Sequence, residues 1–143
     1  MANERVLLVD DEVDFTAVLK ERMEARGLSV VTAANGPEAV QAVRKKTFDA
    51  IILDLQMPGM DGIETLREIL KLDEKAQVIL LTGHATPKKG VEAIKHGAVD
   101  FLEKPADIQD MLRMIGAAAD KRMELVEKHS MEKIMGIIKS RGW

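Results

Sequence analysis

The chain has 143 residues, with 24 acidic and 21 basic side chains and no cysteine. This length suits one domain with a short appendage, and the lack of cysteine excludes a disulfide framework and cysteine-ligated metal sites. The charge is uneven, at −6 over residues 1–120 and +3 over residues 121–143. An acidic body with few aromatic side chains suits nucleic acid poorly, so we expect no direct DNA binding.

The sequence also lacks the features of a membrane or exported protein. No apolar run reaches the roughly 18 residues that a membrane-spanning helix needs. The first residues lack the basic start of a signal peptide. We therefore expect no membrane partner and a cytoplasmic location.

The first hundred residues alternate between short apolar runs and helical patterns. Aliphatic and β-branched runs without polar alternation are typical of strands buried on both faces. In chain order, we expect strands at residues 6–9, 28–31, 50–53, 78–81 and 98–102, with helices beginning near residues 15, 37, 63, 87 and 108. Gly27 predicts the end of the first helix and Pro37 the start of the second. The alternation predicts an α/β fold, a doubly wound five-stranded parallel sheet with helices on both faces.

The end of the chain predicts a helical extension. Residues 107–143 contain no proline, and Asp107 is the expected N-cap. A near-heptad apolar stripe from Leu112 to Val126 then changes phase, which predicts a break at residues 128–130. We divide the chain into a domain at residues 1–120 and a helical tail at residues 121–143. We expect the tail to project past the body or to contact an acidic surface, and self-association through it is one of the open alternatives.

Polar side chains follow four of the expected strands. Asp10 and Asp11 follow the first, Asp54 the third, Thr82 the fourth and Lys104 the last. The carboxyl ends of parallel strands meet at one edge of a sheet, where ligands bind. Clustered carboxylates need a counter-ion, and Mg²⁺ prefers such oxygens together with a phosphate. Lys104 and Thr82 could then hold a phosphoryl group, and Asp54 could act as the nucleophile that forms an aspartyl phosphate.

Each of these residues also has an ordinary structural explanation. A pair such as Asp10-Asp11 after a strand often caps a helix, and a single threonine or lysine at a strand end is usually structural or solvated. Their combination at four strand ends favours a functional site. The three histidines lack metal-ligand spacing, although His84 is close enough in sequence to Thr82 to modulate the site.

Four motifs together resemble the receiver domain of bacterial two-component response regulators. They lie at residues 6–12, 51–62, 81–85 and 100–105, and the resemblance covers roughly residues 4–118. The resemblance is to chemotaxis-type regulators, and we expect the chain to be a single-domain response regulator. The resemblance implies that Asp54 is the phosphoacceptor. It also implies that Mg²⁺ is bound directly by Asp11, Asp54 and the backbone carbonyl of Gln56, and through water by Asp10.

The resemblance assigns roles at the other strand ends as well. Thr82 and Lys104 would bind the phosphoryl oxygens, and Phe101 would be the switch aromatic that turns inward when Thr82 is drawn to the phosphoryl group. Many relatives have tyrosine at the position of Phe101, so switching here must rest on packing alone. The resemblance also implies a cis peptide between Lys104 and Pro105, which lets Lys104 turn back to reach Asp54, although only about 5–6% of X–Pro bonds are cis.

The expected function is therefore phosphorylation-dependent signalling. The partners would be a sensor histidine kinase and an unknown downstream protein, which would bind the surface around the fourth and fifth helices. Two alternatives remain: a phosphorelay intermediate that passes the phosphoryl group onward, and a phosphatase-type hydrolase that uses an aspartyl phosphate. Such hydrolases carry a second aspartate two residues after the nucleophile, where this chain has Gln56, so we expect that the chain is not an enzyme.

Overall fold

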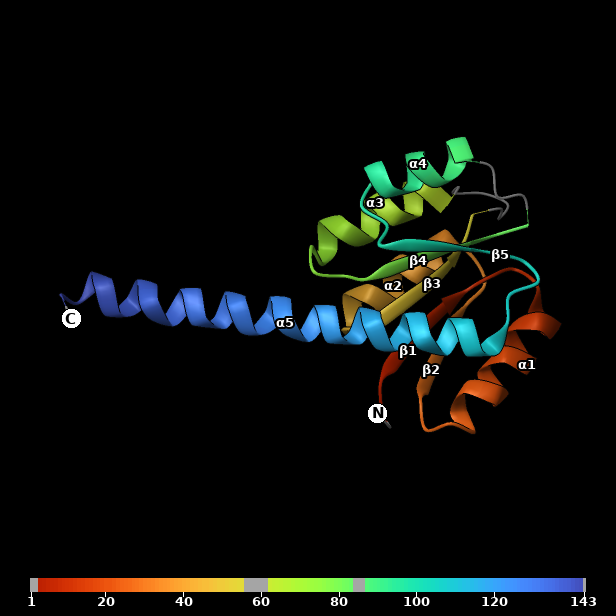
Figure 1. Ribbon diagram of the computed structural model, residues 1–143, viewed down its shortest axis with the longest axis horizontal. Coiled ribbons are helices and arrows are strands. Elements are labelled where there is room, and N and C mark those ends of the chain that lie inside the picture. Colours follow the sequence, from red (N-terminus) through yellow and green to blue (C-terminus); the bar gives the residue numbers. More distant parts are fainter. Residues whose placement is uncertain (1–2, 56–61, 84–86, 143) are drawn as a thin grey trace.

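The computed structural model describes residues 3–55, 62–83 and 87–142. Its centre is a five-stranded parallel sheet with the strand order β2-β1-β3-β4-β5 (Figure 1). The strands are β1 (Arg5–Val9), β2 (Ser29–Ala33), β3 (Ala50–Asp54), β4 (Val78–Thr82) and β5 (Asp100–Glu103). The predicted sheet is therefore confirmed.

Helices cover both faces of this sheet. Packed against one face are α1 (Val13–Glu24) and α5 (Ile108–Ser140), and against the other α2 (Gly36–Lys45), α3 (Gly62–Leu72) and α4 (Pro87–Lys95). A separate hydrophobic core lies on each face of the sheet, and successive residues of a central strand belong to opposite cores, as Leu7 and Leu8 of β1 do. This two-sided burial explains why the strand sequences lack polar alternation.

The helix ends follow the local chemistry of the sequence. Gly27 adopts a φ of 90° just after α1, a conformation that glycine reaches without steric cost. The side chain of Asn35 accepts a hydrogen bond from the Glu38 N–H at the start of α2. Asp107 caps α5 as predicted, by accepting a hydrogen bond from the N–H of Gln109.

The predicted break in the tail is wrong, because α5 runs without interruption from Ile108 to Ser140. Residues 128–130 are Lys, His and Ser, each of which costs a helix interior well under about 1 kcal/mol. The change of phase therefore shifts the apolar stripe to another side of the helix, and the helix itself continues. Among the described residues, no helix is both long and apolar enough to cross a membrane. The division at residue 120 stays a prediction.

One ion pair fixes the point where α5 leaves the body. A guanidinium nitrogen of Arg122 lies 2.8 Å from a carboxylate oxygen of Asp73, which follows α3, and both side chains are largely buried. Beyond it, the helix extends away from the sheet as expected, with the C-terminus far from the body (Figure 1). The contact between basic tail and acidic body is thus confirmed at Arg122.

We predict that Arg122→Ala lowers the free energy of unfolding by about 1–3 kcal/mol, because Asp73 loses its cation in a largely buried place. Urea denaturation measures this change. Arg113→Ala is the matched control, since Arg113 pairs with Asp110 at 2.7 Å on the exposed side of the same helix. That variant should lose about 0.5 kcal/mol or less. Equal losses in the two variants would show that Arg122 is not an anchor.

Candidate functional site

The sheet register brings the carboxylates of two strands together. Val9 of β1 lies opposite Leu53 of β3, so Asp10 and Asp54 follow at the same edge of the sheet. Carboxylate oxygens of Asp10, Asp11 and Asp54 lie within 4.8 Å of one another. Asp10 and Asp54 are buried, whereas Asp11 is exposed to solvent. Two buried carboxylates this close together require positive charge nearby.

Lys104 supplies part of that charge. Its Nζ atom lies 2.9 Å from Oδ2 of Asp10 and 3.5 Å from Oδ2 of Asp54. The peptide bond between Lys104 and Pro105 is cis, as predicted. The backbone N–H of Lys104 donates a hydrogen bond of 2.7 Å to the carbonyl of Thr82. The ends of β4 and β5 are therefore joined at the site itself.

The charged state of Lys104 is strongly favoured. Burial on its own lowers the pKa of this ammonium group, but the close contacts with Asp10 and Glu12 and the charge of Asp54 outweigh burial. The net effect raises the pKa of Lys104 above its ordinary value. Lys104 is therefore a permanent cation at the centre of the carboxylates.

Asp10 is only partly satisfied by the protein groups around it. Its Oδ1 accepts a hydrogen bond from the N–H of Glu12 at 2.9 Å. Its buried Oδ2 lies 2.9 Å from the Lys104 ammonium and has no other partner among the residues that the structure describes. Three carboxylates gathered around one lysine, two of them buried, fit a hard divalent cation such as Mg²⁺. The donor set, made only of oxygens, argues against softer metals.

Two residues that contact Lys104 were not predicted as members of the site. Oε1 of Glu12 lies 3.0 Å from Nζ of Lys104, and the Phe15 ring centroid lies 5.0 Å from the same atom. Glu12 is also the N-cap residue of α1, so Asp10 and Asp11 do not occupy that position. The acidic run Asp10-Asp11-Glu12 is the one sequence feature that could have indicated a place for Glu12 in the site. Phe15 fits the apolar stripe of the first helix, so the sequence predicted only a core position for it and not its contact with Lys104.

Phe101 fits beneath α4 through a close approach to Gly90. The ring is half-buried and packs against the core cluster under α2, α3 and α4. A Cβ atom added to Gly90 would lie 2.7 Å from Cε1 of Phe101, closer than real contacts allow. The ring can therefore occupy this position only because residue 90 of α4 is glycine. Thr82 is buried at the end of the neighbouring strand.

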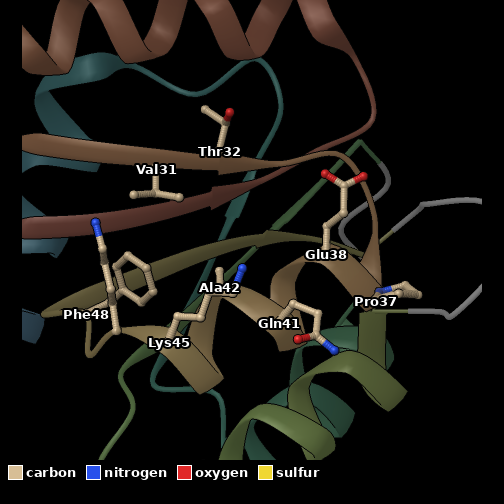
Figure 2. A pocket seen from close by; sticks show the side chains of 9 residues that line it. Val31, Thr32, Pro37, Glu38, Gln41, Ala42, Lys45 and Phe48 are labelled. Atoms are coloured by element: carbon tan, nitrogen blue, oxygen red, sulfur yellow. The ribbon is translucent and has the colours of Figure 1, made fainter.

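Other predicted members of the site cannot be placed. Gln56 and His84 lie outside the residues that the structure describes. A separate hollow of about 460 Å³ lies between β2 and α2 (Figure 2). It is lined by side chains such as Val31, Glu38 and Phe48 and includes none of the clustered carboxylates. The chemistry is therefore concentrated at the strand ends and not in this hollow.

Comparison with known proteins identifies the family. Residues 6–116 match the response regulator receiver domain. The chain is 37% identical over 119 residues to the transcriptional regulatory protein ZraR of Klebsiella oxytoca, which covers 82% of this chain and 27% of that protein. It is 34% identical over 128 residues to the C4-dicarboxylate transport transcriptional regulatory protein DctD of Rhizobium meliloti, covering 90% and 28%. The chain thus spans about a quarter of the length of these relatives.

The fold agrees with this match. A CheY-like response regulator receiver domain protein from Methanospirillum hungatei superimposes with a TM-score of 0.81 at 28% identity. The alignment covers 86% of this chain and 98% of that one. Receiver domains are the signal-accepting modules of two-component systems, which agrees with the acidic cluster found at the strand ends. The chain therefore belongs to the response regulator receiver domain family.

Proposed function

We propose that Asp54 accepts a phosphoryl group from a sensor histidine kinase, and that phosphorylation changes the surface around α4 and α5 to which a downstream protein binds. The observation that carries the proposal is the position of Asp54. Its carboxylate is buried at the end of a central strand, beside two further carboxylates and 3.5 Å from the Lys104 ammonium. Such a site suits a carboxylate nucleophile better than a structural aspartate.

The transfer would be a single displacement at phosphorus. A carboxylate oxygen of Asp54 forms the new O–P bond, and the P–N bond of the donor phosphohistidine breaks with its electron pair returning to the imidazole. Lys104 stays protonated and binds a phosphoryl oxygen as a point charge. The Thr82 hydroxyl donates a hydrogen bond to another phosphoryl oxygen. Both groups act by electrostatic stabilisation, which is the main way proteins promote this reaction.

A divalent metal forms part of this proposal. Asp10, Asp11 and Asp54 would hold Mg²⁺, with the carbonyl of Gln56 as a further ligand. When bound, the ion would offset the negative charge shared by the carboxylates and the phosphoryl oxygens. The closeness of the three carboxylates, within 4.8 Å of one another, supports this assignment.

The chain is proposed to be a kinase substrate rather than a hydrolase. Position 56 is glutamine, so the second carboxylate that such a hydrolase needs as general acid is lacking there. The relatives ZraR and DctD are named as transcriptional regulators, but this chain spans only about a quarter of their length. We therefore propose only the receiver function for it. The acidic body supports the expectation that the chain does not contact DNA directly. This expectation and the cytoplasmic location both stay predictions.

Incubation with acetyl phosphate and Mg²⁺ should add one phosphoryl group per chain, and Asp54→Asn should abolish the addition. Intact-protein mass spectrometry measures both results. Asp120→Asn is the control, because this carboxylate is exposed on α5 and outside the cluster. Undiminished labelling of Asp54→Asn would refute the assignment.

Mg²⁺ affinity should fall at least about tenfold in Asp11→Ala and much less in Glu12→Ala. The reason is geometric: Asp11 belongs to the carboxylate cluster, whereas the Glu12 carboxylate pairs with Lys104. Isothermal titration calorimetry gives both affinities. Equal losses would mean that Asp11 contributes only general negative charge.

Gly90→Ala should displace the Phe101 ring even without phosphorylation, because the new methyl group needs the space of the ring. In protein labelled with fluorophenylalanine, the ¹⁹F signal of Phe101 should shift, and beryllofluoride should then move it less than in the wild type. Asp54 labelling should persist. Gly136→Ala is the matched helical control, since its Cβ meets nothing within 4 Å. An unchanged Phe101 signal in Gly90→Ala would show that residue 90 and the Phe101 ring are not sterically coupled.

A further inference from the structure

The distal part of α5 carries an apolar stripe that the body does not cover. Beyond Leu125 the helix has left the sheet (Figure 1). Met131, Ile134 and Ile137 are about half exposed or more, at 60%, 52% and 50%. Several large apolar side chains on one face of a free helix mark a contact surface.

This stripe is not a continuation of the one that binds the body. The proximal part of α5 packs on the sheet through Met111, Ile115 and Ala118, and Arg122 follows on the same side. The same spacing continued reaches Leu125 and then only polar or small residues, namely His129, Glu132 and Gly136. At about 100° of rotation per residue, the stripe centred on Ile134 lies roughly 130° around the helix from the body-facing side. The distal stripe is therefore directed at something other than the chain's own domain.

Two opposite charges interrupt this stripe symmetrically. Glu127 lies seven residues before Ile134, and Arg141 lies seven residues after it. Two helical turns bring both residues to within about 20° of the direction of Ile134. Neither forms an ion pair with any other residue in the described part of the chain. The apolar centre of the stripe thus has an acid at one end and a base at the other.

We propose that the occupant of this stripe is the same helix of a second copy, packed antiparallel about a two-fold axis at Ile134. In that arrangement Glu127 faces Arg141 of the partner subunit, twice, and Met131 faces Ile137 of the partner subunit. A parallel, in-register pair would instead place Glu127 against Glu127 and Arg141 against Arg141, which like-charge repulsion disfavours. The charge order of the stripe therefore selects both the partner and its direction.

The geometry leaves room for the second helix. The body lies on a different side of α5 from the stripe, so the partner helix can run back towards Leu125 without meeting the domain. The overlapping segments are about 15 residues long, or roughly 22 Å. We expect a contact this short to bury less than the about 1,200 Å² that is usual for stable complexes. The dimer is therefore weak and dependent on concentration, and it does not require phosphorylation of Asp54.

Sedimentation equilibrium of the full chain tests the proposal by charge reversal. The wild type should dimerise as its concentration rises. Glu127→Lys and Arg141→Glu should each weaken dimerisation at least about tenfold, and the double variant should restore it to within about threefold of the wild type. Glu132→Lys, on the opposite side of the helix, is the control and should have little effect. Circular dichroism and Asp54 labelling verify that each variant is folded.

Cross-linking then tests the direction. The chain has no cysteine, so single cysteines can be introduced cleanly. A mixture of Met131→Cys and Ile137→Cys chains should form the mixed disulfide-linked dimer, and Met131→Cys alone should not link. A monomeric wild type, single reversals without effect, a double variant that stays weak, or self-linking of Met131→Cys would each overturn the antiparallel dimer.

Discussion

The structure depends on a balance of charge at the carboxyl ends of its strands, where the Lys104 ammonium lies among clustered carboxylates and offsets their repulsion. Lys104 is 2.9 Å from Asp10 and 3.5 Å from Asp54. The raised pKa of this lysine keeps it charged, so the site retains one fixed cation. The parallel sheet brings side chains from residues 10, 54 and 104 to the same end, and its buried strands support that end of the sheet.

The same edge connects the site to the rest of the fold. The hydrogen bond from the Lys104 N–H to the Thr82 carbonyl joins β5 to β4. Two residues before the end of β5, Phe101 packs beneath Gly90 of α4. We propose that movement of Thr82 towards a phosphoryl group reaches α4 through this end of the sheet. On the opposite side of the sheet, α5 is held to the body as far as Arg122 and then extends freely.

The sequence predicted the sheet and the carboxylate cluster well, because apolar runs and polar strand ends are local signals. Contacts that depend on three-dimensional packing were missed. Glu12 and Phe15 reach Lys104 across about 90 residues of sequence, and nothing local reveals that pairing. The continuous α5 was mistaken for two helices because a phase change at residues 128–130 was interpreted as a break, although those residues tolerate a helix.

The central claim is that Asp54, and no neighbouring carboxylate, carries the phosphoryl group. Reduction of the phosphorylated protein with borohydride converts an aspartyl phosphate to homoserine, and peptide mass spectrometry then locates it. The account predicts homoserine at position 54 alone, and only in samples that contained Mg²⁺. Homoserine at position 10 or 11, or at position 54 to the same extent without any divalent cation, would contradict it.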